Sequence, residues 1–405
     1  MNIGRIKPIN IMECSGLLYT FAVSFSASTG TLFVKSTRVL IFAIFAFNIF
    51  RSKKLKKLPL LYYTYTGTFF AFCCFSIIWA VSRKIAVNSI TTLLYIIIIN
   101  WILFITLHKR PSYIVDIFRA IIWGAIFHAA NIYLQFGLTI YLFNRGGSNG
   151  VENANTLAYV TSIAVILCIV ITSNNLVKNK HLYHILLVLN IISAILTASR
   201  KVFLFIGVFV TVYYILKSNN SIKIIRNIIL VLLALLSIMV LIFRVQFLYT
   251  LVGSRIETMI IGFLGGTTDS SVGFRLHLIE WGIEWFKEKP LIGHGIDCYK
   301  FLLGTRYSNT WVGSAGVYAH NNYIELLVDV GLLGTVLYYA GYVLIIGKYI
   351  KIRKLKNNLA IAMLAIVLSL LVTEYGQISY SIAFLQEVIM LIWFIVFNHS
   401  SFCKY

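Results

Sequence analysis

The stretch NSITTLLYIIIINWILFITL (88–107) contains no charged residue and is dominated by Ile and Leu. A helix needs about 20 such residues to cross the hydrocarbon core of a bilayer. Similar runs recur along the 405-residue chain, of which 59% is hydrophobic and 12% charged, with a mean hydropathy of +0.86. Because a soluble domain is closer to about a quarter charged, the sequence predicts an all-α integral membrane protein.

Apolar segments divide the chain into about 12 expected transmembrane helices. They are 11–27, 37–50, 59–81, 88–107, 115–140, 156–174, 184–199, 202–216, 227–245, 322–346, 359–376 and 380–398. We therefore expect an N-terminal bundle of about nine spans (1–245), an extracytoplasmic loop (246–321) and about three C-terminal spans (322–405). Such a long loop is more often functional than a mere connection.

The net charge of +22 indicates membrane topology rather than nucleic-acid binding, because the charge is distributed between the spans. Lys and Arg collect in short connecting runs: 51–57, 109–110, 178–180, 217–226 and 348–356. The positive-inside rule places these runs in the cytoplasm. Both termini are then cytoplasmic and the long loop faces outward. Some attraction of the basic runs to anionic membrane lipid is expected.

The outer loop is expected to contain an amphipathic helix at 273–288. Four apolar side chains share one face at helical spacing: Phe274, Leu278, Trp281 and Trp285. Tryptophan is typical of the membrane interface, so this helix either lies along the headgroups or packs on the helical bundle. Arg275 lies near its N-terminal end, where the helix dipole disfavours a cation. We therefore expect an anionic partner for Arg275.

The chain re-enters the membrane through the segment AHNNYIELLVDVGLLG (319–334). His320 lies at the expected start of a helix, where the positive end of the dipole favours the neutral imidazole that accepts a proton. A lone histidine at a helix start is more often structural than functional. Here, however, Glu325 and Asp329 follow one turn apart on one face of a membrane helix. Buried acids in spans are costly and are functional candidates by default.

Arg200 interrupts an apolar run within the segment Ser199-Arg200-Lys201, on the outer side of the predicted topology. Alone, it would be read as a snorkelling anchor. Together with Arg275 and His320, it makes a set of outward basic groups. These residues predict an anion site at the outer interface, suited to a lipid-linked diphosphate.

Four motifs, in order along the chain, resemble those of the O-antigen polymerase and O-antigen ligase superfamily. They are Asn153-Ala154-Asn155, Ser199-Arg200, the run from Gly273-Phe-Arg-Leu to Pro-Leu-Ile-Gly-His-Gly (290–295), and His320-Asn321 followed by Gly331 and Gly334-Thr335. Each motif alone is weak, but the combination is specific. The resemblance covers residues 140–340, and the first five expected spans are compatible with it.

The resemblance implies a C-type membrane glycosyltransferase fold, a glycan linked to undecaprenyl diphosphate as substrate, and no metal or other cofactor. It assigns diphosphate binding to Arg200 and Arg275 and the catalytic histidine to His320. The sequence has no Asp-x-Asp motif, and arginine can replace a metal because a guanidinium binds two phosphate oxygens at once. As further substrate-binding candidates we name Asn321, Glu325, Asn155 and Tyr323.

The implied reaction is the attack of a sugar hydroxyl on the anomeric carbon of a glycan carried on undecaprenyl diphosphate, with loss of the diphosphate. Arg200 and Arg275 would stabilise the charge that develops on the leaving diphosphate. His320 would orient or deprotonate the attacking hydroxyl. Glu325, one turn further along the helix, is placed to orient His320.

The motifs are shared by polymerases and ligases. We favour a polymerase of repeat units for O-antigen, capsule or exopolysaccharide. The sequences of 319–327 and of Leu337-Tyr338-Tyr339 resemble those of capsule or O-antigen polymerases more than those of ligases. The alternative is a ligase that transfers the finished glycan to lipid A core or another acceptor, as in lipopolysaccharide assembly. A polysaccharide transporter or flippase is less favoured, because no inverted repeat is evident. We expect a bacterial cytoplasmic (inner) membrane location, with a chain-length regulator and a flippase as partners.

Overall fold

The computed structural model describes residues 8–26, 31–51, 60–136, 154–197, 199–218, 220–263, 270–306, 317–355 and 357–398. Within these residues the regular structure is helical and no strand occurs, so the expectation of an all-α protein is confirmed. The Gly- and Asn-rich stretch before Ala154, including Asn153, and part of the long loop lie outside the described residues.

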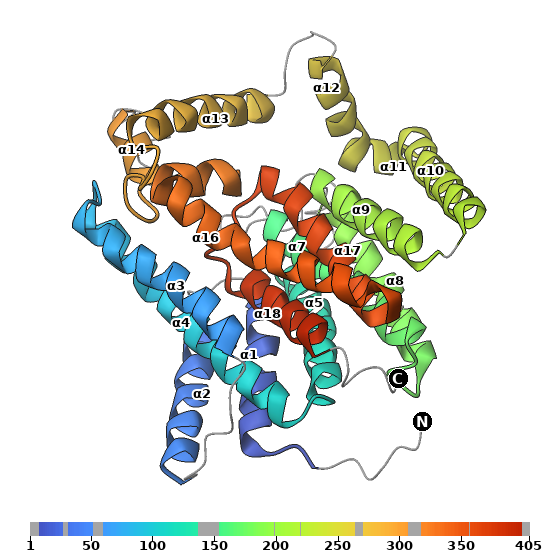
Figure 1. Ribbon diagram of the computed structural model, residues 1–405. Helices are drawn as coiled ribbons and strands as arrows, with labels where there is room; N and C mark the ends of the chain where they lie inside the picture. The colour runs from blue at the N-terminus through green and yellow to red at the C-terminus, as the bar shows by residue number, and fades with distance from the viewer. Residues whose placement is uncertain are drawn as a thin grey trace.

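The first half of the chain forms a bundle of helices that run past one another (Figure 1). Its elements are α1 (Ile11–Ser26), α2 (Leu32–Arg51), α3 (Leu60–Phe75), η1 (Ser76–Ile78), α4 (Arg83–Lys109), α5 (Tyr113–Phe136), α7 (Ala154–Ser173), α8 (Lys180–Leu196), α9 (Arg200–Lys217) and α10 (Ser221–Arg244).

The second half begins with shorter helices and ends in helices that return to the bundle. Its elements are α11 (Gln246–Leu248), η2 (Tyr249–Gly253), α12 (Ser254–Phe263), α13 (Ser270–Glu288), α14 (Tyr299–Arg306), α16 (Asn322–Ile352), η3 (Arg353–Leu355), α17 (Asn358–Thr373), η4 (Glu374–Gly376) and α18 (Ala383–Phe397).

Seven helical stretches among the described residues are long and apolar enough to cross a membrane. They are Leu60–Ile78, Arg83–Lys109, Tyr113–Leu134, Asn155–Ser173, Ile222–Arg244, Asn322–Leu355 and Asn358–Gly376. Three shorter apolar helices accompany them: Ile11–Ser26, Lys180–Leu196 and Ala383–Phe397. The chain is therefore a multi-pass membrane protein. The total of about 12 spans stays a prediction, although every expected span overlaps a helix.

The C-terminal helices pack into the N-terminal bundle: α17 lies against α9, α16 against α3, and α18 against α4. Aromatic side chains fill these contacts. Phe104 of α4 meets Phe394 of α18 edge to face, with ring centroids 5.7 Å apart, and Tyr65 of α3 stacks on Trp393 at 5.5 Å. Because these helices share one buried core, α9 and the start of α16 are brought to the same region although more than a hundred residues separate them.

The amphipathic helix of the outer loop, α13, lies across the start of α16 (Figure 1). Its apolar face packs on α14 and α16. Leu278 and Trp285 are buried there beside Tyr299 and Val328. At Gly282 a Cβ would lie 2.2 Å from Cγ2 of Ile324, which shows how closely α13 approaches α16. The helix therefore packs on the protein, and its placement along the headgroups stays a prediction.

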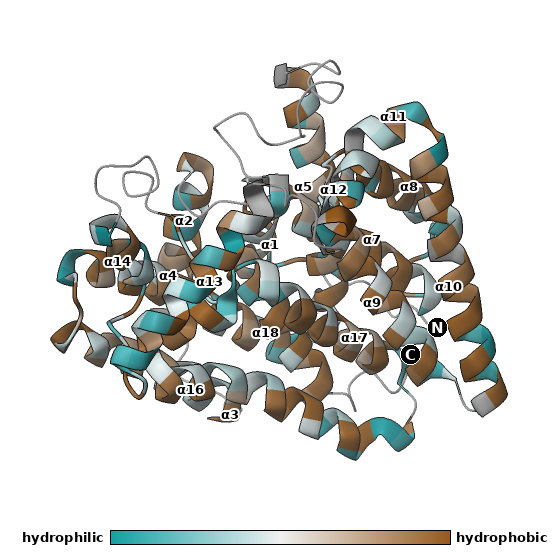
Figure 2. Cartoon of the chain, turned by 90° about the horizontal axis from the view of Figure 1, so that it is seen from above, coloured by the Kyte–Doolittle hydropathy of each residue, from teal (hydrophilic) through white to brown (hydrophobic). Residues whose placement is uncertain are grey.

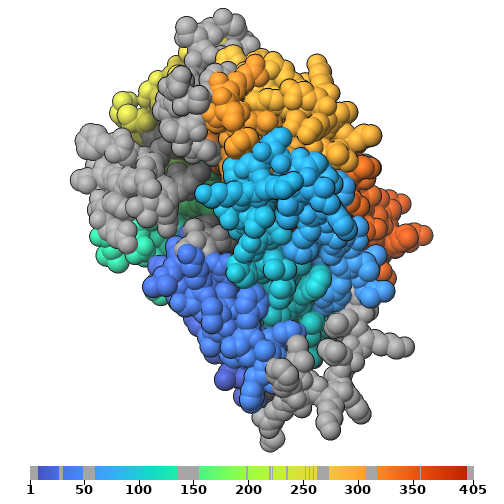
Figure 3. All heavy atoms as spheres, turned by 90° about the vertical axis from the view of Figure 1, so that its left-hand side faces the viewer, coloured from blue at the N-terminus to red at the C-terminus, as the bar shows by residue number. Residues whose placement is uncertain are grey.

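The turn that follows α13 also binds the hairpin between α3 and α4. The indole Nε1 of Trp79 donates to the carbonyl of Ile292 at 3.1 Å, and the amide of Val81 donates to the carbonyl of His294 at 2.9 Å. Figure 3 shows α13 and α14 covering the end of the α3 and α4 hairpin. Segments 76–82 and 292–298, which the charge pattern assigns to one side of the membrane, thus lie together.

A break in α16 accommodates this turn. Gly331 adopts φ = +65°, which interrupts the helix. The turn at 290–295 fills the break, because its amides and carbonyls pair with backbone groups that the helix no longer uses. The amide of Gly295 donates to Asp329 O, and the amide of Leu332 donates to Pro290 O, both at 2.8 Å. On the side of the turn, Gly293, at φ = +68°, is the residue that lies closest to the backbone of α16.

Helix α10 is held very differently. Most of its described side chains are exposed, with Ile242 buried near its end, and its main neighbour is α9. It stands at one side of the molecule in Figure 1, and the hydropathy colouring of Figure 2 shows its predominantly apolar surface. In a bilayer this surface is suited to contact with lipid chains.

Candidate active site

The start of α16 is fixed by its own sequence. Asn321 is the N-cap, and its Oδ1 accepts hydrogen bonds from the amides of Tyr323 (3.0 Å) and Ile324 (3.2 Å). The buried Oε2 of Glu325 accepts a hydrogen bond from the amide of Ala319 at 2.5 Å. Together these contacts set the backbone on both sides of His320.

His320 adopts φ = +53°, in the left-handed region. A non-glycine residue there costs on the order of 1–3 kcal/mol, and such strain is concentrated at functional sites. Its ring lies 4.1 Å from that of Tyr318 between centroids. Its Nδ1 is buried without a hydrogen-bond partner within the described structure. An accepting nitrogen in such a place is suited to a substrate hydroxyl.

The surroundings of His320 keep its imidazole neutral. Burial is the main cause that lowers its pKa from 6.5 to about 3, and the positive charges of Arg275 and Lys201 add to the effect. The structure thus brings Arg275, from α13, and Lys201, from α9, close enough to act on one histidine at the start of α16. A neutral imidazole is the form able to accept a proton.

The motif residues on α7 and α9 also meet. The hydroxyl of Ser199 donates to Oδ1 of Asn155 at 3.1 Å, and both side chains are buried. Arg200 is the first residue of α9 and Lys201 the second. The bond between Ser199 and Asn155 thereby ties the start of α9, with its two cations, to the start of α7.

Lys201 follows Arg200 in the sequence without a motif role of its own. In the structure its ammonium donates to the carbonyl of Gly376 and to Oε1 of Gln377 at 3.2 Å, and it lies 6.0 Å from the ring centre of Tyr159. The only sequence signal for this role was the position of Lys201 directly after Arg200. The acceptors lie about 175 residues further along the chain.

Glu374 is a second residue whose role the sequence did not reveal. Its buried carboxylate accepts hydrogen bonds from the hydroxyls of Tyr339 and Tyr342, both at 2.7 Å, from that of Ser379 at 2.5 Å, and from Nδ2 of Asn322 at 3.3 Å. Asn322 is the residue after the N-cap of α16. Glu374 therefore anchors the start of that helix in the bundle. In the sequence it is a single acid in the expected span 359–376.

The further substrate-binding candidates differ in accessibility. Asn155, Asn321 and Glu325 are buried, and the hydrogen bonds given above engage each of them. Tyr323 is partly exposed; its hydroxyl donates to Leu371 O at 2.6 Å and its ring stacks on Tyr339 at 5.1 Å. Of the four, Tyr323 presents the most surface to a substrate. Asn321 and Glu325 shape the backbone around His320, and Asn155 binds Ser199 at the start of α9.

Asp329, expected to be functional because it is acidic and lies in a span, holds the outer loop. Its carboxylate accepts hydrogen bonds from the amides of Asp297 and Tyr299, both at 2.8 Å. Tyr299 is the first residue of α14, so Asp329 secures the turn that leads into that helix. Among the described residues no group of three or more His, Cys, Asp or Glu side chains is arranged to hold a metal ion.

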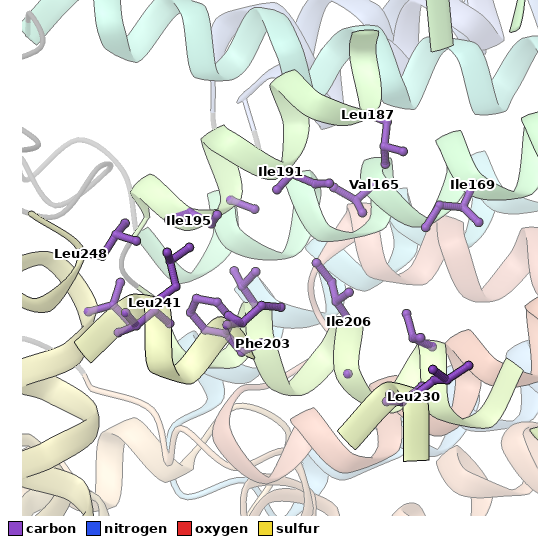
Figure 4. Close-up of a pocket in the computed structure, with 18 of the residues that line it drawn as sticks. Val165, Ile169, Leu187, Ile191, Ile195, Phe203, Ile206, Leu230, Leu241 and Leu248 are labelled. Carbon is purple, nitrogen blue, oxygen red and sulfur yellow. The ribbon is translucent and has the colours of Figure 1, made fainter. Parts of the chain in front are cut away.

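An apolar groove begins beside the start of α9 and runs along α8, α9 and α10. Its volume is about 720 Å³. The lining includes Ala194 and Val202 near the cationic end and Val210, Tyr214 and Leu230 further along. Figure 4 shows Leu187, Ile191 and Ile195 facing Phe203, Ile206 and Leu241 across it. Over the 12 residue steps from Val202 to Tyr214 the groove extends about 18 Å along the helix.

Comparison with known protein families gives one match. Residues 185–339 match a family described as O-Antigen ligase. The matched segment contains Arg200, Arg275 and His320. The resemblance to the O-antigen polymerase and ligase superfamily, expected from the motifs, is therefore confirmed over this segment. The comparison with curated proteins finds no relative.

Proposed function

We propose that the protein is a glycosyltransferase that polymerises oligosaccharide repeat units carried on a lipid diphosphate, such as undecaprenyl diphosphate, at the outer face of the bacterial cytoplasmic membrane. The match to the O-antigen ligase family supports this chemistry at the level of polymerase or ligase. The observation that carries the proposal is the site itself: a strained, neutral His320 lies within the electrostatic influence of cations from α9 and α13.

In this reaction Arg200 and Arg275 bind the diphosphate of the donor. Their guanidinium groups hold its oxygens in a bidentate manner and stabilise the negative charge that grows as the bond to the anomeric carbon breaks. The two residues are supplied by different elements, α9 and α13, so a diphosphate between them would be held from two sides. Arginine supplies the positive charge that a metal ion would otherwise provide.

His320 accepts the hydrogen of the attacking sugar hydroxyl. Its lowered pKa keeps the ring neutral at physiological pH, so a nitrogen is available as acceptor. When the anionic diphosphate binds beside it, the cations Arg275 and Lys201 are partly compensated and the imidazole becomes more basic. Substrate binding would therefore prepare His320 for proton transfer.

The apolar groove along α8, α9 and α10 is suited to the lipid tail of the donor. It begins beside the start of α9, where Arg200 lies, so one molecule can place a diphosphate at the cations and an isoprenoid chain in the groove. Burying the tail contributes about 0.8 kcal/mol per CH₂ group. The diphosphate then adds specificity at the end of the groove.

The outward orientation of the site rests on the basic runs, which the positive-inside rule assigns to the cytoplasm. Glu284→Cys, on the exposed side of α13, should react with a membrane-impermeant maleimide in whole cells. Lys351→Cys, an exposed position near the other end of α16, should react only after permeabilisation. The reverse pattern would move the site to the cytoplasm and contradict the proposed reaction.

The deciding experiment supplies purified protein in lipid nanodiscs with a defined repeat unit on undecaprenyl diphosphate. A polymerase lengthens the lipid-linked chain, whereas a ligase leaves it unchanged until lipid A core or another acceptor is added. We expect chains of several repeats and release of undecaprenyl diphosphate without a further acceptor. Transfer only to an added core acceptor would identify a ligase. Adding EDTA should leave the rate unchanged, and an EDTA block reversed by one divalent metal would contradict the role given to the arginines.

A further inference from the structure

The start of α9 carries two adjacent cations, Arg200 and Lys201, at the positive end of a helix dipole. Two positive charges there oppose the dipole, which favours anions. An anion at this helix start would be attracted both by the dipole and by the two cations. Arg200 has a place in the proposed reaction, but Lys201 does not yet have one.

A clasp formed by residues 374–380 fixes the position of Lys201. The ammonium donates to the carbonyl of Gly376 and to the amide oxygen of Gln377, and both acceptors are neutral. They hold the ammonium in place beside the start of α9. Gly376 also limits the space around it, since a Cβ at that position would lie 3.1 Å from Cε of Lys201.

The same clasp holds the start of α16 through Glu374 and Asn322. Besides its bond to Glu374, Asn322 uses Oδ1 to accept the amides of Ser379 (2.8 Å) and Tyr380 (3.4 Å). Asn322 lies two residues after His320. One short segment is therefore hydrogen-bonded both to Lys201 of α9 and to the helix start that follows His320. This segment lies beyond the matched residues 185–339.

We propose that Lys201 is a third diphosphate-binding cation of the active site, and that the clasp 374–380 positions it relative to His320. This inference rests on the proposed function. An ammonium is a compact charge that can turn toward either phosphate, whereas each guanidinium is a planar fork. Arg200 and Arg275 would hold the diphosphate in register, while Lys201 would add charge at the phosphate that faces His320. Lys201 would thus contribute to diphosphate binding mainly through its positive charge.

The test measures binding rather than turnover, using full-length protein in detergent and farnesyl diphosphate as a short probe, with farnesyl monophosphate for comparison. A hydrogen bond to a charged group is worth about tenfold or more in affinity. We expect Lys201→Ala to weaken diphosphate binding by about tenfold and monophosphate binding by less. Lys201→Arg, which keeps the charge, should recover most of the loss.

Gly376→Ala gives a second variant that keeps the lysine and its charge. The added methyl group displaces the ammonium, so we expect about a threefold loss of diphosphate affinity. Gly347→Ala is the matched control, because nothing lies within 4 Å of a Cβ at that position. In a Lys201→Ala background, Gly376→Ala should have no further effect, which would show that Gly376 acts through Lys201.

The outcomes separate the two proposals. If the wild-type protein does not prefer the diphosphate to the monophosphate, and Arg275→Ala changes neither affinity, the proposed function fails. If Arg275→Ala weakens diphosphate binding while Lys201→Ala and Gly376→Ala leave it at the wild-type value, only the role of Lys201 is overturned. A Gly376→Ala effect that persists in the Lys201→Ala background would overturn the positioning role of the clasp.

Discussion

The polar region around His320 and the apolar groove beside α10 are built in opposite ways. Around His320, side chains and backbone groups from α9, α16 and the clasp are joined by hydrogen bonds between buried or partly buried partners. Along the groove, apolar side chains of α8 and α9 face α10, whose described side chains are mostly exposed. The first arrangement fixes atoms within a fraction of an ångström, as chemistry requires. The second arrangement suits a long apolar chain that needs little positional precision.

The largest effect is expected where the polar region is most tightly packed. Gly331→Ala adds a Cβ that would lie 2.4 Å from the backbone carbon of Leu291, at a residue with φ = +65°. The strain at a positive φ alone costs on the order of 1–3 kcal/mol, and the collision adds to it. We expect a strong loss of folded protein, measured by thermal unfolding in detergent. Gly347→Ala, on the same helix, should unfold at the wild-type temperature, and equal stability of the two variants would contradict the packing of the 290–295 turn against α16.

A large effect on activity, without loss of folding, is expected at Arg275. Arg275→Lys keeps a positive charge but loses the bidentate fork, so we expect the polymerisation rate to fall by about a hundredfold, as for the loss of one preorganised donor. Arg83→Lys, at an exposed position at the start of α4, is the control. Wild-type rates from Arg275→Lys at equal protein levels would show that Arg275 contributes only its positive charge and not a bidentate contact.

A smaller effect is expected from a substitution in the apolar groove. Ile206→Trp places a larger side chain in the space shown in Figure 4, so the affinity for a long-chain lipid-linked donor should fall about tenfold, equivalent to losing contact with about two CH₂ groups. The affinity for farnesyl diphosphate should change less. Leu204→Trp, exposed on the same helix, is the control. An equal loss for both variants, or a loss that does not depend on chain length, would remove the lipid tail from the groove.

The polymerisation activity should depend only weakly on pH. A free histidine titrates near 6.5, and a base with that pKa would lose activity as the pH falls below it. Burial, Arg275 and Lys201 lower the pKa of His320 to about 3, so its neutral form persists to well below pH 6. We expect kcat/KM, which reports the free enzyme, to stay flat between pH 7.5 and 5.5 on stable protein. An acid limb near pH 6.5, absent in His320→Gln, would show that the ring is solvated rather than buried among cations.

The sequence allowed the elements of the fold to be predicted, because apolar length and helical spacing are local properties. The apolar run at 88–107 lies in α4, and the face with Leu278 and Trp285 is the buried face of α13. The motif residues Arg200, Arg275 and His320 lie within the segment that the family match covers, and Arg275 lies close enough to His320 to lower its pKa.

What the sequence did not reveal depends on contacts between distant segments. The bond from Lys201 to Gly376 joins residues 175 positions apart, and no local pattern marks Gly376 or Gln377 as partners. Asp329 was expected to be functional because an isolated acid in a span is costly. In the structure the turn after α13 folds into the break at Gly331, and the amides of Asp297 and Tyr299 satisfy the carboxylate. The cost of burying the acid is thus offset by a loop whose return to the helix could not be read from spacing.

The central claim is that His320 serves glycosyl transfer from a lipid diphosphate, and one measurement tests it most directly. Wild-type protein, His320→Ala and His277→Ala are each reconstituted with undecaprenyl-diphosphate-linked repeat units, and chain length and released undecaprenyl diphosphate are measured together. His277 is the control, because it is exposed on α13 and paired with Glu280. We predict chains and released carrier from wild type and His277→Ala, and neither product from folded His320→Ala. Chain growth by His320→Ala at the wild-type rate would contradict the account.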